Sequence, residues 1–192
     1  MRGPKAAATL LSLAALAAPT TASAATGGVA PPSDAPRSNG SSGGSQFENR
    51  PPARPPVSRV ARLVRGVAYP PAGAPLAVVR AIRAGNKLRS KPYRYGGGHA
   101  SFDDTAYDCS GAVSFALHGG RLLKAPLNSS GFMVWGARGR GRWITVYANP
   151  GHAYAVIAGL RFDTSGTGGS GPRWQLQQRD PAGFIARHPA GL

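Results

Sequence analysis

The sequence contains a single cysteine, Cys109, among 192 residues. One cysteine excludes an internal disulfide, and it excludes the cysteine-rich zinc sites because these need several thiolate ligands. Four histidines are present, but they lack the spacing of metal ligands, and the sequence has no phosphate-binding loop or dinucleotide motif. We therefore expect no bound metal and no other cofactor, which leaves Cys109 available for chemistry of its own.

Acidic residues are scarce. Seven Asp and Glu stand against 23 Lys and Arg, which gives a net charge of +16. A cationic protein is drawn to anionic polymers, which outside a bacterium are wall polymers and phospholipid head groups. The basic residues are dispersed and no nucleic-acid-binding motif accompanies them, so we expect no nucleic-acid partner. A soluble surface with a high isoelectric point, without a specific polymer partner, is the alternative interpretation.

The chain lacks a hydrophobic run of the roughly 20 residues that a bilayer-spanning helix needs. A shorter apolar stretch, residues 6–18, follows Arg2 and Lys5 and precedes Ala22-Ser23-Ala24. This order is typical of a secretory signal and predicts a signal peptide at 1–24. We expect a protein that is secreted, either extracellular or associated with a bacterial cell wall. Exported small domains usually carry disulfides, so a lone thiol in this setting favours a reactive role.

The composition predicts a flexible linker between the signal and a globular domain. Residues 25–75 are basic, and the first part of this segment is rich in Pro, Gly and Ser without apolar periodicity. Within the segment, residues 57–68 place apolar side chains at helical spacing between arginines, which predicts a short amphipathic helix. Such a helix either lies on a membrane or wall surface or packs on its own domain.

Residues 76–192 form the predicted domain, which we expect to be monomeric. A helix is expected from residue 76 to residue 85 or 87, and a second helix over 110–117 after a glycine-rich loop. Most of 122–141 is expected to be irregular. Strands are expected at 143–147, 153–158, 160–164 and 184–187. Helices followed by an antiparallel sheet indicate an α+β fold.

The strongest chemical signal is the placement of Cys109 at the start of the second helix, with His152 at the start of a strand. Only the thiolate attacks a carbonyl, and the N-terminus of a helix favours the anion. A nearby imidazole can take the proton and later return it to the leaving group. This layout predicts a thiol nucleophile with a histidine base. The alternative is that Cys109 is a small buried apolar side chain.

Two motifs resemble those of the NlpC-type cell-wall peptidases, a papain-like family that cuts peptide stems of bacterial peptidoglycan. They are PYRYGG at 92–97 and DCSG at 108–111, within a similar region that spans about 76–164. The resemblance implies a papain-like fold with Cys109 as nucleophile and His152 as base. It also implies that Asp108 and Ser110 help to hold the free amino end of the stem peptide. Tyr95, with Tyr93 behind it, is the match to a tyrosine that lines the family's site.

A third polar residue usually orients the histidine in this family, and here its position falls on Asp163. A carboxylate that accepts the imidazole N–H would fix the tautomer and stabilise the imidazolium. The alternative is that Asp163 only closes an Asx-type turn in the loop that follows. His188 is the reserve candidate for this role. His99 is interpreted as a turn residue, with a position at the rim of the cleft as the alternative, and His118 as a helix-capping residue.

The chain also departs from the family, because residues 140–147 replace a Pro-Gly-Asp segment that often precedes the histidine strand. The leading hypothesis is a secreted cysteine peptidase acting on peptidoglycan stem peptides, held near the wall by diffuse charge. A papain-like amidase or acyltransferase is a second possibility. A third is a non-catalytic basic protein that binds the wall or a membrane on a degenerate peptidase scaffold.

Overall fold

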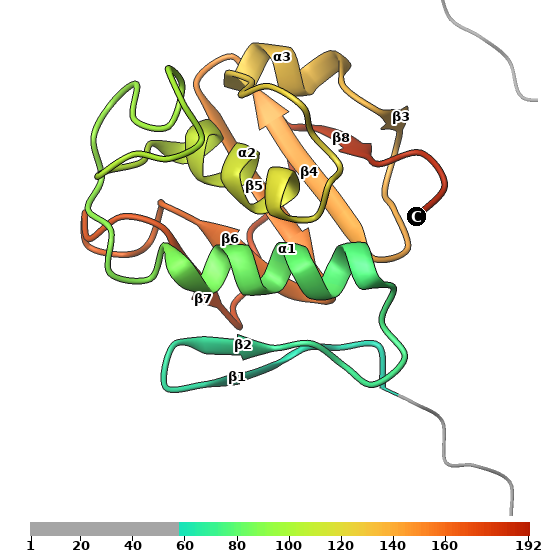
Figure 1. Ribbon diagram of the computed structural model, residues 1–192. Helices are drawn as coiled ribbons and strands as arrows, with labels where there is room; N and C mark the ends of the chain where they lie inside the picture. Colours follow the sequence, from blue (N-terminus) through green and yellow to red (C-terminus); the bar gives the residue numbers. More distant parts are fainter. Residues whose placement is uncertain (1–57) are drawn as a thin grey trace, which may run out of the picture. The chain divides into compact units, whose positions relative to one another are not determined.

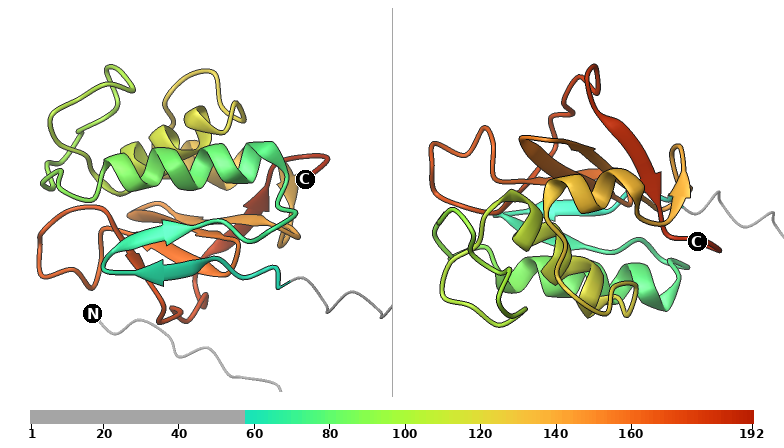
Figure 2. Two further views of the ribbon diagram at one scale, coloured as in Figure 1. Left: turned by 60° about the horizontal axis from the view of Figure 1, so that its bottom comes forward. Right: turned by 90° about the horizontal axis from the view of Figure 1, so that it is seen from above.

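The computed structural model describes residues 58–192. The predicted signal peptide at 1–24 and most of the predicted linker lie outside these residues. The described part combines helices with an antiparallel sheet, so the α+β prediction is confirmed. Figure 1 shows α1 (Leu76–Lys87) and α2 (Cys109–Gly119), and Figure 2 shows both helices on one side of the sheet.

The main sheet has six strands in the order β3-β8-β4-β5-β6-β7, and every neighbouring pair is antiparallel. Its strands are β3 (Ala137–Arg138), β4 (Ile144–Asn149), β5 (His152–Ile157), β6 (Leu160–Asp163), β7 (Arg173–Gln175) and β8 (Ile185–His188). The four strands expected from the sequence are all present, with ends shifted by at most two residues. β5 and β6 are joined by a tight turn at Ala158 and Gly159, both with positive φ. That turn brings the start of β5 alongside the end of β6.

The hydrophobic core lies between the helices and one face of the sheet. Side chains alternate along β4 and β5, so Ile144, Val146 and Ala148 pack with Ala153 and Ala155 beneath the helices. The helices approach each other closely at Gly119, where a Cβ atom would clash with Ala84. The core therefore holds the N-terminus of α2 in a fixed position against the sheet.

The predicted amphipathic helix at 57–68 is wrong. This region contains the hairpin β1 (Arg62–Val64) and β2 (Val67–Tyr69), whose turn residues Arg65 and Gly66 have φ values of 48° and 76°. Positive φ at both turn residues is the geometry of a tight hairpin turn. The apolar residues of this region therefore lie on two short paired strands and not along one face of a helix.

The hairpin is part of the domain, so the predicted domain start at residue 76 is also wrong. Ala61 and Ala68 are buried in the core, and the N–H of Ala61 donates to the carbonyl of Ala158 at 2.7 Å. The side-chain amide of Asn86 in α1 accepts from the N–H of Ala68 at 2.9 Å and donates to its carbonyl at 2.8 Å.

Three further elements were not predicted. The segment 122–141 contains α3 (Ser129–Val134) and β3, and β7 follows the loop at 164–172. The side chain of Asn128 begins α3 by accepting a hydrogen bond from the N–H of Gly131. α3 lies beside β4 and β8, at the end of the sheet where His152 begins β5 (Figure 1).

Replacement of Asn86 by Ala tests the hairpin attachment. The change leaves both polar groups of Ala68 without their partner, so we expect the free energy of unfolding to fall by about 1–3 kcal/mol. Urea denaturation measures the change, with Lys87→Ala on the exposed side of the same helix as the control. Equal stability of the two variants would contradict a role for Asn86 in docking the hairpin.

Candidate active site

Cys109 is the first residue of α2, and Asp108 is its N-cap. The Asp108 carboxylate accepts from the N–H of Gly111 at 2.8 Å through Oδ1 and from the N–H of Gly96 at 3.0 Å through Oδ2. These bonds tie the glycine loop to the start of the helix. Gly111 and Gly97 are in such close contact that a Cβ on Gly111 would clash with the Gly97 carbonyl. The glycines therefore allow the loop to pack directly against the helix that carries the thiol.

His152 and Asp163 lie together, as the predicted hairpin required. His152 begins β5, Asp163 ends β6, and His152 Nε2 is 2.9 Å from Asp163 Oδ1. The same carboxylate oxygen accepts the N–H of Ser165 at 2.9 Å, which forms the Asx-type contact proposed as the alternative. Both interpretations of Asp163 therefore describe real contacts, and they share one oxygen atom.

Asp163 is only 3% exposed, and cations surround it. Arg161 Nε and Arg179 Nη1 each lie 3.6 Å from Oδ2, which has no hydrogen bond of its own. Burial alone would raise the pKa of this carboxyl group. The hydrogen bonds from His152 and Ser165 outweigh burial, so its pKa is lowered and the group is ionised at neutral pH.

The pKa values of Cys109 and His152 move in opposite directions. Burial alone would raise the pKa of the Cys109 thiol, but hydrogen bonding with His152 and with the N–H of Ala153 outweighs burial and lowers it. Burial alone would lower the pKa of His152, but its bonds to Asp163 and to the thiol raise it to about 9. With Nε2 directed at Asp163, Nδ1 is the nitrogen left for the thiol. These shifts favour a thiolate–imidazolium pair at neutral pH.

A cavity of about 430 Å³ opens beside the thiol. The residues that line it are Tyr93, Tyr95, Gly96, His99, Asp108, Cys109, Ser110, Asn128, Ser129, Pro150 and Gly151. All of the candidate substrate-binding residues are therefore at the mouth or wall of one cavity. Tyr95 is 89% exposed, so it stands at the rim and makes little contact with the protein.

The structure places His99, for which a position at the cleft rim was the secondary interpretation, and Ser165, which the sequence did not indicate, in the site. His99 Nε2 lies 3.0 Å from Asp108 Oδ1 and 3.1 Å from the hydroxyl of Ser110, so His99 is more than a turn residue. The hydroxyl of Ser165 lies 3.3 Å from His152 Nε2. No pattern in the sequence marks Ser165, whereas His99 stands next to the glycine loop that binds Asp108.

The other two histidines lie elsewhere. His188 lies in β8, where its Nδ1 is 3.1 Å from the carbonyl oxygen of Gly139. It does not pair with His152, so it is no longer a candidate for the residue that orients His152. His118, near the end of α2, contacts the carbonyl of Leu123 and stacks on Phe102.

Between residues 58 and 192, no cluster of three His, Cys, Asp or Glu side chains has the arrangement of a metal site. None of the helices in this region has the length and apolar character that a membrane crossing requires.

No protein-family model matches the chain, and no curated protein matches it. The P60 domain of an antigen from Mycobacterium avium subspecies paratuberculosis is 20% identical, with a TM-score of 0.46 over 58% of this chain and 93% of that chain. A hypothetical invasion protein of Mycobacterium tuberculosis is also 20% identical, with a TM-score of 0.44 over 59% of this chain and 62% of that chain.

The coupling of Cys109 and His152 can be measured by alkylation with iodoacetamide as a function of pH, read by intact mass. In the wild type we expect a labelling pKa below the ordinary thiol value of about 8.5. Replacement of His152 by Ala should raise it, because the largest contribution that opposes burial is then removed and only the N–H of Ala153 remains against it. A labelling pKa that does not respond to this substitution would show that the thiol is not activated by His152.

Replacement of Asp163 by Asn tests the third residue. The change removes the carboxylate charge that stabilises the imidazolium, so the pKa of His152 should fall below the value of about 9 expected for the wild type. A His152 pKa raised from 6.5 to about 9 stabilises the fold fully below pH 6.5, and this contribution is lost as the pH rises through 9. The variant should therefore lose more stability at neutral pH than above pH 9.

An NMR titration of the His152 ring and thermal unfolding at several pH values would measure these two effects of Asp163→Asn. Ser165→Ala is the matched control, because it removes a hydroxyl group near Nε2 without changing the charge. An unchanged His152 titration in Asp163→Asn would rule out this role for the carboxylate.

Proposed function

We propose that the protein is a secreted cysteine peptidase that hydrolyses amide bonds in peptidoglycan stem peptides. The observation that carries the proposal is the contact series from the Cys109 thiol through His152 to buried Asp163, at the N-terminus of α2 and beside an open cavity. A helix N-terminus with a thiol on one side and an antiparallel sheet with the imidazole on the other is the arrangement expected of a papain-like peptidase.

The proposed reaction has two stages. The Cys109 thiolate attacks the amide carbonyl, and the developing oxyanion is stabilised by backbone N–H groups at the start of α2. Imidazolium His152 then donates its proton to the departing amine, which leaves a thioester on Cys109. In the second stage His152 takes a proton from water, the water oxygen attacks the thioester, and the carboxylic acid product leaves as the thiolate is regenerated.

The charge distribution of the cavity supports a substrate with a free amino end. None of its lining residues is a lysine or an arginine, although the chain carries 23 of them, and Asp108 is its only carboxylate. A peptide ammonium group would therefore meet an attractive field beside the thiol. Asp108 already accepts from Gly96, Gly111, His99 and Ser110, so its carboxylate is held in place before substrate arrives.

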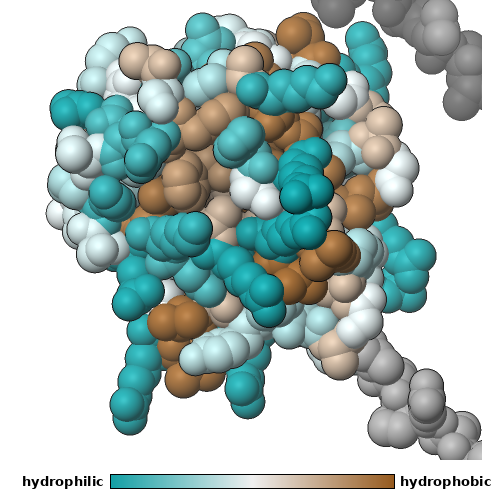
Figure 3. Space-filling view, in the orientation of Figure 1, coloured by the Kyte–Doolittle hydropathy of each residue, from teal (hydrophilic) through white to brown (hydrophobic). Residues whose placement is uncertain are grey.

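Retention at the wall would come from diffuse charge. Figure 3 shows hydrophilic side chains spread over the face that carries α1, with hydrophobic atoms between them. Charge that is spread in this way attracts a polyanion without a defined complex, and salt screens it beyond about 8 Å at 0.15 M. Activity on intact walls should therefore fall as salt rises, whereas activity on a small soluble stem peptide should change little.

Digestion of purified peptidoglycan by the mature protein, with the products identified by mass spectrometry, tests the proposed function. We expect a new amine and a new carboxylate within the stem peptide, and no products from Cys109→Ala, whose fold should be retained. His152→Ala should reduce the rate by about 10²–10⁴-fold.

Other products would point to other activities. Release of the stem from its sugar-linked lactyl group would indicate an amidase, and a transferred acyl chain would indicate an acyltransferase. Full activity of Cys109→Ala would refute the thiol mechanism, and an inactive wild type with an unreactive thiol would favour a non-catalytic wall-binding protein.

A further inference from the structure

A second cavity lies on the face of the sheet that the helices do not cover. Its floor consists of two cross-strand pairs, Thr145 with Val156 and Tyr147 with Tyr154. These side chains alternate with the core residues of β4 and β5, so they point away from α1 and α2. The cavity has a volume of about 380 Å³.

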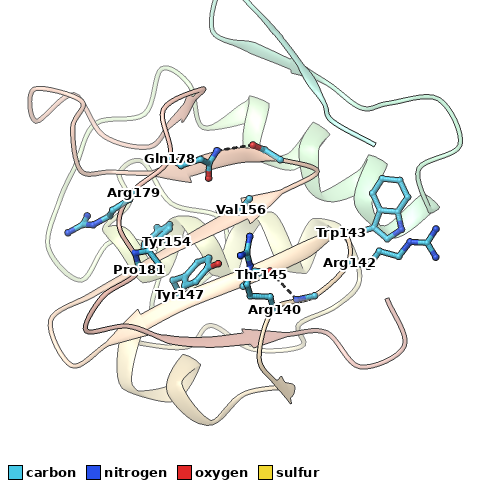
Figure 4. Close-up of a pocket in the computed structure, with 12 residues that line it drawn as sticks. Arg140, Arg142, Trp143, Thr145, Tyr147, Tyr154, Val156, Gln178, Arg179 and Pro181 are labelled. Carbon is cyan, nitrogen blue, oxygen red and sulfur yellow. Dashed lines mark hydrogen bonds between the residues drawn. The ribbon is translucent and has the colours of Figure 1, made fainter. Parts of the chain in front are cut away.

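The segment 178–181 forms one wall of this cavity. Gln178 Nε2 donates to the carbonyl of Gly159 at 2.9 Å, which fastens the wall to the β5–β6 turn (Figure 4). The opposite side is formed by the segment 140–143, and the N–H of Gly141 donates to the Thr145 hydroxyl at 3.1 Å. Both walls are therefore held to the sheet by hydrogen bonds.

The charged residues that line this cavity are all cationic. They are Arg140, Arg142 and Arg179. Figure 4 shows Arg140 beside Thr145 over the floor, whereas Arg179 at the Tyr154 end and Arg142 beside Trp143 point outward in opposite directions. Asp180 stands next to Arg179 in sequence, but its carboxylate accepts from the N–H of Ala182 at 3.0 Å and does not line the cavity.

Arg140 and Arg142 form no salt bridge with any carboxylate in the part of the chain that the structure describes. A guanidinium group over a concave surface, as Arg140 is here, attracts an oxyanion and can bind it with two parallel hydrogen bonds. The Tyr147, Tyr154 and Thr145 hydroxyls supply neutral donors, and burial raises the pKa of Tyr154 to about 12, so it keeps its proton.

We propose that this cavity binds the phosphodiester group of an anionic polymer, at a site separate from the thiol cavity. The aromatic residues argue against a nucleic acid as the polymer. Tyr147 and Tyr154 stack on each other with centroids 4.9 Å apart and are 7% and 1% exposed. Their faces are therefore not available to stack a base, which single-stranded nucleic-acid sites require. A phosphate with its polyol or sugar neighbours needs only the cations and the hydroxyl groups.

The site can be tested by NMR titration of the ¹⁵N-labelled mature protein in 0.15 M salt with bis(glycerol) phosphate, a soluble phosphodiester. We expect saturable one-to-one binding, with shifts concentrated at Gly141, Thr145 and Gln178. Arg140→Gln should weaken the affinity about tenfold, as loss of a charge-assisted bond predicts. Arg83→Gln, which removes one exposed charge from α1 on the other side of the sheet, should change it less than about twofold.

Each other outcome overturns the proposal. Equal weakening by the two substitutions, or shifts spread over α1, would show diffuse attraction. No saturation would show that there is no site, and acetate binding as tightly as the phosphodiester would show a general anion site. The Cys109→Ala variant should bind the probe with unchanged affinity, so failure here would be distinguishable from failure of the proposed peptidase activity.

Discussion

Burial of a carboxylate is costly unless opposite charges and hydrogen-bond donors surround it, and the site of this protein is built around one such group. Asp163 receives His152 and the N–H of Ser165 on one oxygen, while Arg161 and Arg179 face the other at 3.6 Å. These neighbours come from β5, β6 and the segments after β6 and β7. The ionised carboxylate thus fixes the relative positions of the elements that surround His152.

The same arrangement sets the chemistry at the thiol. An ionised Asp163 keeps His152 protonated, and a protonated His152 stabilises the Cys109 thiolate, so one buried charge acts over two contacts. The orientation depends on the tight turn at Ala158 and Gly159, because a slip of one residue between β5 and β6 would send Asp163 to the opposite face of the sheet. The turn geometry is therefore part of the active-site geometry.

Sequence reasoning worked where a local pattern and a buried face agreed. The helix behind Cys109 and the four main strands have apolar runs bounded by turn residues, and the contact of His152 with Asp163 followed from two strands joined by a short turn. It failed at residues 57–68, where two three-residue strands are too short to display a period of two. The Arg65-Gly66 pair was the one local indication of a hairpin turn in this segment. The helical spacing of the apolar residues favoured a helix instead.

Some contacts leave no trace in a single sequence because they depend on tertiary packing. His99 reaches Asp108 only because the glycine loop folds back on α2, and Ser165 reaches His152 only through the turn after β6. α3 and β7 are six and three residues long, and their positions are set by the sheet that they flank. Short elements of this kind gain most of their stability from contacts that sequence periodicity does not report.

The two cavities differ in the positive charge of the residues that line them. The thiol cavity has no lysine or arginine, whereas the cavity on the far face of the sheet has three arginines and no carboxylate. Arg179 lines the far cavity, lies 5.7 Å from the centroid of the Tyr154 ring and faces Asp163 at 3.6 Å. Arg179 is therefore partly compensated by a buried carboxylate, whereas Arg140 and Arg142 have no carboxylate partner among the described residues.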